Sequence, residues 1–376
     1  MKVMIVVTHL LGTGHLARAL TLGRAFAAQG DTVMVVSGGT PVPHFDTQGL
    51  SLVQLPPVHS NGTDFTTLLT QQGTPASPVD MQARGDQLLA SLAAFAPDVL
   101  ITELFPFGRR ILRDEFRAVL ETARTLPQRP LTLASIRDIL APPSKPAKAA
   151  FADDMISRFY DGVLVHSDPD IVPLSRSWPV SDTLGPYLHY TGFVAPPAPG
   201  HVVQSHGEIL VSTGGGSVGD AVFKAASDAA RAMPETLWRF VVGGADARVA
   251  HLSASAPPNV TVEGLRPDFR DLLGGAAASV SMCGYNTALD ILQTGVRAVL
   301  IPFDDGGEVE QGLRADALAS QPGIAMLTQD ALSGGALAQA LTRVMNAPAR
   351  PPRTSGMDGA TQTVQIVHAL AQGHAA

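Results

Sequence analysis

Cysteine is nearly absent from this sequence, and aromatic residues make up only 5% of its 376 positions. The single cysteine, Cys283, excludes an intramolecular disulfide framework and a cysteine-rich zinc site, and it is compatible with the reducing cytoplasm, where we expect the protein. No uninterrupted apolar run reaches the roughly 20 residues that span a bilayer, so we expect at most peripheral membrane contact. The net charge of −7 argues against nucleic acid as a partner, because nucleic acid usually binds to a basic face.

A metal-ligand pattern is missing as well. The histidines outside the motifs discussed below do not have the short spacing that a zinc site requires. Among these residues are His44, His59, His166, His189, His201 and His206. We therefore expect no catalytic metal and no bound cofactor.

A glycine-rich turn near the start of the sequence contains Gly12 and Gly14 and leads into the amphipathic stretch Leu16–Ala28. Such a strand-to-helix turn lets backbone N–H groups approach an anion at the positive end of the helix. The turn also matches the dinucleotide pattern G-x-G-x-x-A. However, the acidic residue expected about 20 positions later is missing, because the second strand ends at Val36-Ser37-Gly38-Gly39. If the turn stood alone, helix packing would be the simpler explanation of its glycines.

A second turn of the same kind lies between the apolar run Ile209–Ser212 and the helical stretch Asp220–Met233. Its residues are Gly214, Gly215, Gly216 and Ser217. Two such turns predict two similar α/β halves that face one another with a ligand between them. This layout is typical of an enzyme that joins a nucleotide-activated donor to an acceptor.

Apolar, β-branched runs alternate with helix-length stretches along the sequence, which predicts parallel sheets covered on both faces. A chain of 376 residues also exceeds the usual size of one hydrophobic core. Proline-rich breaks at Ala195–Gly200 and Ala347–Gly359 divide the pattern. We therefore expect a first domain over residues 1–195, a second over 206–347, and a tail over 348–376 that carries a last helix.

The apolar runs give the expected strands and the periodic stretches give the expected helices. The strands after the first are expected at Thr32–Val36, Val99–Thr102, Leu131–Ile136, Val163–His166, Ile209–Ser212, Arg239–Val242, Val260–Glu263, Ala278–Met282 and Val296–Ile301. Helices are expected within Arg109–Leu126 and Ser144–Asp161. The polar segment Pro56–Asp80 is expected to be a mobile loop that could close over a ligand, although long polar insertions are more often passive.

The segment Ala278–Gln311 has the most specific pattern. A buried strand ends before a helix whose first turn holds Asn286 and Thr287, and either residue can cap that helix. Asp290 lies one turn further along, where its carboxylate suits two vicinal hydroxyls, as on a ribose. For a single stretch, helix capping and a solvated charge run would be the simpler interpretation. Several such loops at one sheet edge favour a binding site instead.

These residues resemble the GT-B glycosyltransferases, and specifically the MurG-like family 28 transferases. The turn before His15 resembles that family's Gly-rich loop with its adjacent histidine, and Cys283–Asp290 resembles its Ser/Gly-Gly-x-x-T-x-x-E segment. Cys283 and Tyr285 are bulkier than the residues common there, and Thr102–Gly108 places the chain nearer to a poorly characterised bacterial branch. The resemblance implies two Rossmann-like domains facing a cleft, with the acceptor side first, the nucleotide-sugar side second, and a last helix that returns to the first domain.

The resemblance also implies a nucleotide-sugar donor, with UDP favoured, and an unidentified acceptor hydroxyl, on a polysaccharide, a lipid-linked molecule or a small molecule. By this match Thr287 faces the diphosphate, Asp290 binds the ribose, and Leu265 and Arg266 belong to the loop that contacts the base. The full set of expected donor-binding residues is Gly12, Gly14, Arg18, Gly214, Gly215, Gly216, Ser217, Leu265, Arg266, Asn286, Thr287, Asp290, Glu310 and Gln311.

Sugar transfer to a hydroxyl needs a base. We expect His15, which titrates near neutral pH, to be that base, although it could instead cap its loop or touch a phosphate. Glu103 ends a strand of the same sheet and could orient His15, act as the base itself, or be an ordinary strand-end carboxylate. The run Gly12–Arg18 also resembles the G-x-G-H-x-x-R motif of the nucleotide-sugar hydrolases of the pseudaminic acid pathway, which pass the sugar to water. A non-catalytic nucleotide-sugar-binding module is a third alternative.

Overall fold

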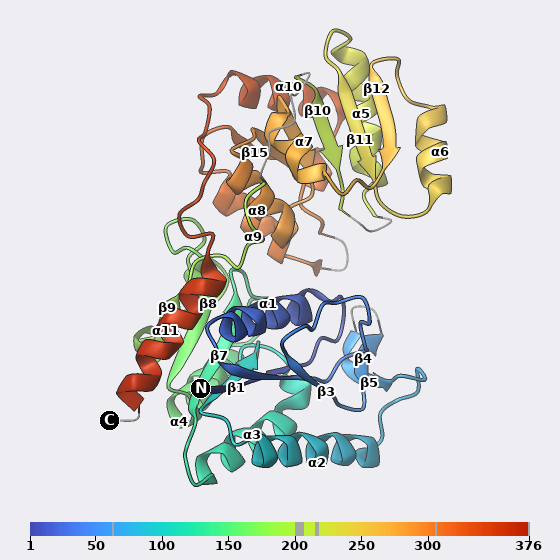
Figure 1. Ribbon diagram of the computed structural model, residues 1–376. Coiled ribbons are helices and arrows are strands. Elements are labelled where there is room, and N and C mark those ends of the chain that lie inside the picture. The colour runs from blue at the N-terminus through green and yellow to red at the C-terminus, as the bar shows by residue number, and fades with distance from the viewer. Residues whose placement is uncertain (62–63, 200–206, 215–217, 305–306, 375–376) are drawn as a thin grey trace. The chain divides into compact units, whose positions relative to one another are not determined.

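Buried runs of valine, isoleucine and leucine in the first part of the chain form a seven-stranded parallel sheet (Figure 1). Such runs are typical of strands that are covered on both faces. The structure is a computed structural model that describes residues 1–61, 64–199, 207–214, 218–304 and 307–374. The chain divides into two units, Met1–Val194 with Asp358–Ala376, and Ala195–Met357.

The strand order of the first unit creates a switch point between β1 and β6. In space the strands follow the order β3 (Ser51–Gln54), β2 (Thr32–Ser37), β1 (Lys2–Val7), β6 (Val99–Glu103), β7 (Leu131–Arg137), β8 (Gly162–His166) and β9 (Leu188–Tyr190). The chain adds strands on one side of β1 first and then returns to add the others on its opposite side. Ligands of open α/β sheets bind where this reversal occurs, at the carboxyl ends of the strands.

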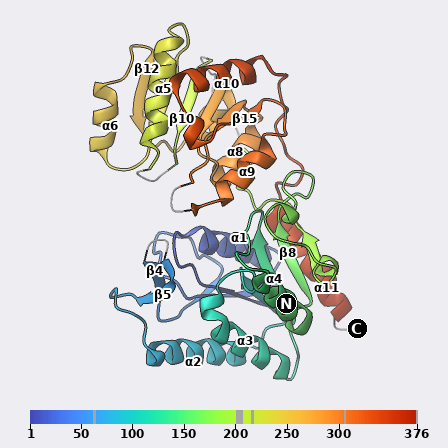
Figure 2. The same ribbon diagram turned by 180° about the vertical axis from the view of Figure 1, so that it is seen from behind.

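Helices cover both faces of this sheet. On one face lie α1 (Gly14–Ala28) and α11 (Gly359–His374), and on the other lie α2 (Pro78–Phe95), α3 (Arg113–Thr125) and α4 (Pro146–Phe159) (Figure 2). Short 3-10 helices occur at Arg110–Leu112, Leu174–Arg176 and Gly185–Tyr187. Leu20 and Phe26 of α1 share a buried cluster with Val364 and Val367 of α11, although the two helices lie at opposite ends of the sequence.

The expectation of a loop over Pro56–Asp80 is wrong. The segment contains an antiparallel hairpin of β4 (Val58–Asn61) and β5 (Asp64–Thr70). It also contains the start of α2, where Ser77 Oγ accepts a hydrogen bond from Asp80 N at 3.2 Å and Asp80 Oδ2 accepts one from Ser77 N at 2.8 Å. Threonine and serine favour strands and helix caps as well as loops, so composition alone misjudged this segment.

The second unit repeats the strand order of the first. Its six parallel strands follow the order β12 (Val260–Gly264), β11 (Trp238–Val242), β10 (Ile209–Ser212), β13 (Ala278–Ser281), β14 (Ala298–Leu300) and β15 (Ile324–Met326). The switch point therefore lies between β10 and β13. The two parallel, Rossmann-like sheets confirm the predicted α/β fold class.

Helices also pack on the second sheet. α5 (Asp220–Ala232) and α10 (Gly334–Asn346) share its main apolar cluster, while α7 (Phe269–Gly275) and α9 (Glu310–Leu318) both pack against α8 (Tyr285–Thr294). The remaining elements are α6 (Asp246–Ala254), beside β12, and a 3-10 helix at Gln329–Ala331. None of the helices in the described part of the chain combines the length and the apolar character that crossing a bilayer requires.

Candidate active site

His15 and Glu103 meet at the switch point of the first sheet. β1 ends at Val7, and Gly12, with φ of +63°, helps to turn the chain into α1, whose second residue is His15. Glu103 is the last residue of β6, the neighbouring strand. Nδ1 of His15 lies 2.9 Å from Oε1 of Glu103. The structure thus brings together the two residues that the sequence suggested for catalysis.

Glu103 is a buried carboxylate with partners on both oxygens. Its side chain is 2% exposed. Oε1 contacts His15 and accepts a hydrogen bond from Arg18 Nη2, and Oε2 accepts one from Ser135 Oγ at 2.6 Å. Burial alone would raise the pKa of Glu103, but the Arg18 guanidinium and the hydrogen bonds from His15 and Ser135 outweigh it and lower that pKa. Glu103 is therefore an anion whose oxygens are occupied, which suits it to orienting His15 and not to accepting a proton.

The Glu103 contact fixes the tautomer of His15. A carboxylate only accepts hydrogen bonds, so Nδ1 of His15 carries the proton and donates it to Oε1. Arg18 Nη2 also lies 3.2 Å from Nδ1 and could donate to it if Nδ1 were unprotonated. In that case the lone pair of Nδ1 would face the carboxylate oxygen of Glu103 at 2.9 Å, which is repulsive. Nε2 then carries a lone pair, and no described residue hydrogen-bonds to it.

His15 does not titrate near neutral pH, contrary to the expectation from the sequence. Burial is the main cause that lowers its pKa to about 3, and the charges of Arg109 and Arg18 add to the effect against the opposing influence of Glu103. The ring is consequently neutral at physiological pH. Because 13% of the side chain is still exposed, a substrate hydroxyl can reach it.

A second row of buried polar residues supports Glu103, and the sequence analysis missed it. Ser135 gives its one hydroxyl proton to Glu103, so its oxygen accepts from His166 Nε2 at 3.0 Å. His166 Nδ1 then accepts from Thr191 Oγ1 at 2.9 Å. Burial lowers the pKa of His166 to about 3, so its ring is neutral as well. Position along the strands could have indicated these residues, because Ser135 and His166 lie towards the carboxyl ends of the neighbouring strands β7 and β8.

The donor-binding residues expected in the second unit lie at the carboxyl edge of its sheet, whereas Gly12, Gly14 and Arg18 belong to the first unit. Gly214, with φ of +83°, follows β10, and Leu265 and Arg266 follow β12. Asn286 and Thr287 lie in the first turn of α8, after β13, while Glu310 and Gln311 begin α9, after β14. Gly215, Gly216 and Ser217 lie outside the described residues.

The expected side-chain cap of α8 is not present. The N-cap residue is Gly284 and it makes no side-chain hydrogen bond, while Asn286 and Thr287 already lie inside the helix. The sequence placed the cap two or three residues too late, because α8 already begins at Tyr285. The first-turn N–H groups of α8 therefore have no side-chain acceptor from its N-cap residue, as is also the case for α1, where Thr13 is the N-cap.

Asp290 is held by an ion pair. Its side chain is mostly buried, and Oδ1 accepts a hydrogen bond from Arg270 Nε at 2.6 Å. Burial raises the pKa of Asp290, against the influence of Arg270. Arg270 and Gln293 in turn donate to the backbone oxygens of Pro197 and Pro196, at 2.8 and 3.0 Å. Among the described residues no group donates to Oδ2 of Asp290, so one acceptor is left for a hydroxyl.

Two of the other expected residues have structural partners. Arg266 pairs with Asp268 at 2.6 Å and with Glu263 at 3.3 Å, and these hydrogen bonds raise its pKa. Gln311 Oε1 accepts from the backbone N–H groups of Cys283 and Phe303, at 3.0 and 3.2 Å, and so ties together the loops after β13 and β14. Leu265, in contrast, is 59% exposed.

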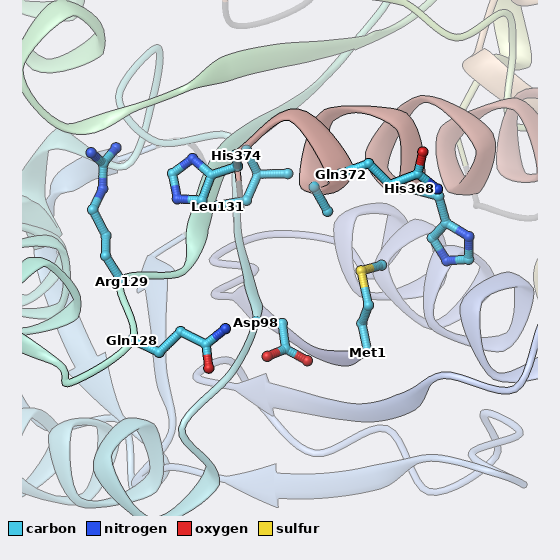
Figure 3. A pocket seen from close by; sticks show the side chains of 9 residues that line it. Met1, Asp98, Gln128, Arg129, Leu131, His368, Gln372 and His374 are labelled. Carbon is cyan, nitrogen blue, oxygen red and sulfur yellow. The ribbon is translucent and has the colours of Figure 1, made fainter. Parts of the chain in front are cut away.

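A hollow of about 810 Å³ lies at the opposite, amino edge of the first sheet (Figure 3). Met1, Asp98 and Leu131, at the starts of β1, β6 and β7, line it together with His368 and His374 of α11. Substrates of open parallel sheets bind at the other edge, so we do not assign this hollow to the active site. The described ranges contain no group of three or more His, Cys, Asp or Glu side chains that could hold a metal ion.

Comparison with known proteins agrees with this arrangement. Residues 213–369 match the family model of the glycosyltransferase family 28 C-terminal domain. MurG of Acinetobacter baumannii is 18% identical, with a TM-score of 0.64 over 99% of both chains. The calicheamicin glycosyltransferase CalG4 is 17% identical, with a TM-score of 0.61 over 99% of this chain and 95% of that one. A UDP-glucosyltransferase from Polygonum tinctorium is 14% identical, with a TM-score of 0.63 over 99% of this chain and 94% of that one.

No curated protein matches the sequence closely enough to count as a relative. Because the identities to the solved structures are below 20%, these similarities establish the fold alone. In these neighbours the fold is that of GT-B glycosyltransferases. The family 28 match adds the chemistry of sugar transfer, and it extends from the turn after β10 into α11. The chain is therefore a glycosyltransferase of the GT-B fold that resembles the MurG-type transferases of family 28.

Proposed function

We propose that this protein transfers a sugar from a nucleotide-sugar donor, with UDP favoured, to an acceptor hydroxyl with inversion and without a metal ion. The observation that carries the proposal is the 2.9 Å hydrogen bond from His15 Nδ1 to Glu103. Because Nδ1 carries the proton, Nε2 of His15 has a lone pair that can accept one, at the carboxyl edge of the first sheet. A base held in one tautomer by a buried carboxylate is suited to deprotonating a hydroxyl.

The reaction is a single displacement. The acceptor oxygen forms a bond to C1 of the sugar while its proton passes to Nε2 of His15. The bond between C1 and the diphosphate oxygen breaks, and the nucleoside diphosphate leaves with the electron pair. Glu103 stabilises the imidazolium that forms, because its negative charge lies 2.9 Å from Nδ1.

The second unit supplies the groups that would hold the leaving diphosphate. The first turn of α8 contains Thr287, and the N-cap residue Gly284 has no side chain that could accept from the N–H groups of this turn. A helix N-terminus also favours negative charge. Oδ2 of Asp290 would accept from the ribose, and exposed Leu265 would contact the base, with Arg266 beside it. Gly12 and Gly14 have open space at their Cβ positions, which leaves room beside His15.

The choice of UDP rests on similar structures. Phytolacca americana UGT2 is described in complex with UDP-2-fluoro-glucose and pterostilbene, and the glycosyltransferase VinC in complex with dTDP. Both ligands contain a pyrimidine nucleoside diphosphate. This supports a pyrimidine donor here and makes dTDP the first alternative to UDP.

A donor screen followed by product analysis tests the proposal. The full chain is screened by thermal shift against UDP-, dTDP-, GDP- and ADP-sugars, and a stabilising donor is then incubated with and without candidate acceptors before mass spectrometry. Glycosylated acceptor supports the transferase. Free sugar that forms equally without acceptor supports the nucleotide-sugar hydrolase instead, and binding without any turnover supports a non-catalytic module.

Replacing His15 tests the base directly. We expect His15→Ala to lower turnover at least about 100-fold while nucleotide affinity is retained, because general-base contributions are of that order. Exposed His44 provides the matched control, and His44→Ala should keep both properties. If nucleotide affinity collapses together with turnover, His15 is a donor-binding or structural residue and the assignment as base is wrong.

A further inference from the structure

The loop after Glu103 holds an arginine in an unusual backbone conformation. Leu104 and Arg109 have φ of +69° and +57°, in the left-handed region that side-chain-bearing residues seldom adopt. Arg109 Nε donates to the backbone oxygen of Thr8 at 2.6 Å. This bond ties the loop after β6 to the end of β1, so the guanidinium is positioned at the switch point. Residues held in such conformations are often found at functional sites.

In the part of the chain that the structure describes, the terminal nitrogens of Arg109 have no partner. Within the described residues, neither Nη1 nor Nη2 makes a hydrogen bond or an ion pair, although the residue is partly buried. Other buried arginines of the first unit do have carboxylate partners. Arg84 makes two contacts of 3.1 Å with Glu115, and Arg18 pairs with Glu103. A desolvated cation without an anion is costly, so a site that retains one is suited to receiving an anion.

The charge of this guanidinium also acts on the base, to which the bond with Thr8 brings it near. The charge of Arg109 lowers the pKa of both His9 and His15, in each case in addition to burial. Burial also lowers the pKa of Arg109 itself, to about 10, against the influence of Glu103, so it is charged at neutral pH. The negative charge of Glu103 is already matched by Arg18, and His15 is neutral. One positive charge at this site is therefore uncompensated.

We propose that Arg109 binds an anionic group, a phosphate or a carboxylate, of the substrate that reaches His15. The two free amino groups of a guanidinium form a planar fork that matches two oxygens of such a group. The proposal rests on the proposed function, because it concerns the substrate of the same site. The anion has two possible sources, the diphosphate of the donor or an acidic group on the acceptor.

Inorganic phosphate is the probe, and the ring signals of His15 are the readout. We would follow these signals by NMR while phosphate is titrated into the full chain. The measurement then reports phosphate binding near His15 and not at other sites. We expect Arg109→Gln to weaken this binding about 10- to 100-fold, because hydrogen bonds to charged groups contribute that much. Arg109→Lys, which keeps the charge and loses the fork, should fall between. The control is Arg113→Gln, at an arginine that is 63% exposed on the adjacent helix, and it should bind as the wild type does.

Repeating the titration with saturating UDP separates the two sources. If UDP abolishes phosphate binding at His15, Arg109 contacts the diphosphate of the donor, and if phosphate still binds, Arg109 serves an acidic acceptor. Equal affinity in the wild type and a folded Arg109→Gln variant overturns the proposal, as does an equal loss in Arg113→Gln. Urea unfolding verifies that each variant is folded. No turnover is needed, so a failed glycosyl transfer assay leaves this result interpretable.

Discussion

Asp290 offers two carboxylate oxygens, and among the described residues a partner, Arg270, is present for Oδ1 alone. If Oδ2 accepts hydrogen bonds from the ribose, Asp290→Ala should weaken donor binding by roughly 1–3 kcal/mol. Isothermal titration of UDP into the full chain measures this change. The ion pair with Arg270 is consistent with this prediction, because it occupies Oδ1 and leaves Oδ2 to accept from the ribose.

The control for Asp290 is its neighbour Gln293. Gln293→Ala removes the contacts with Arg270 and with the Pro196 backbone, and so disturbs the same network without removing a ribose acceptor. UDP affinity should therefore stay at the wild-type value in this variant. Unchanged affinity in Asp290→Ala, or an equal loss in Gln293→Ala, would remove Asp290 from the donor site.

At the residue level, the sequence predicted which polar residues to consider but not their surroundings. His15 could be found because glycines mark its turn, and Glu103 because it ends an apolar strand. Ser135 lies near the end of an apolar strand and His166 ends another, yet nothing in the sequence says which of their neighbours they contact. The low pKa of His15 depends on burial and on Arg109, which is distant in sequence, so a neutral-range pKa was the only available expectation.

The ends of strands β6, β7 and β8 carry a chain of buried groups that should make the first unit sensitive to acid. The folded pKa of His166 is about 3, against an ordinary value of 6.5. Below pH 6.5 the unfolded chain binds a proton that the folded chain does not, so the free energy of unfolding falls as pH decreases from 6.5 towards 3. At pH 5 the loss due to this residue is about 2 kcal/mol. Glu103 adds little to this loss above pH 5, because its folded pKa is lowered from an ordinary value of 4.5.

Urea unfolding at pH 7.5 and pH 5 tests this expectation. Trp178 and Trp238 are the two tryptophans of the sequence and lie in different units, so a Trp238→Phe background reports on the first unit alone. In that background, His166→Gln should reduce the loss of stability between the two pH values, and the exposed control His44→Gln should not. Equal pH dependence in all three proteins would contradict a buried neutral His166.

Element boundaries followed from the sequence where the apolar pattern was continuous. The strands that the sequence predicted have ends within one or two residues of the expected runs, whereas the short strands β3, β9 and β15 were not predicted. The helix expected from Arg109 begins only at Arg113, because Arg109 has a left-handed backbone and a 3-10 turn intervenes. The hairpin β4–β5 was missed because its polar side chains have no apolar alternation long enough to distinguish a strand from a loop.

The whole molecule depends on a helix that is distant in sequence from the sheet it covers. Ending the chain after Met357 removes α11, with buried Val364 and Val367, and leaves part of one face of the first sheet uncovered. We expect the first unit to lose at least about 3 kcal/mol of stability, at roughly 1.5 kcal/mol or more per buried valine, and the second unit to keep its own. Fluorescence of Trp178 and Trp238, each in a background without the other, follows the two units separately.

Point variants on the same helix control for the deletion. Val367→Ala should destabilise the first unit, because Val367 is fully buried, and Gln365→Ala, on the exposed side of the helix, should not. A truncated chain whose Trp178 transition is unchanged would show that α11 does not stabilise the first unit.

At the scale of the molecule, the alternation of strands and helices predicted parallel sheets in two domains, and short motifs around His15 and Asp290 carried the resemblance that implied Rossmann-like domains and sugar transfer. Physical reasons limit how far such patterns extend. The nucleobase, the sugar and the acceptor are selected by surface loops, and loop residues such as Leu265 have no periodic pattern that reveals their ligands. The preference for UDP therefore stays a prediction.

The position of α11 has a consequence for how the protein is made. A ribosome completes the residues of the second unit, up to Met357, before it reaches the last helix of the first. Until then, the apolar face that Val364 and Val367 cover is open to solvent, while the second unit already has every strand and helix it needs. Domains generally fold as they emerge during synthesis. In this chain the unit whose synthesis starts first is therefore the last to reach its final fold.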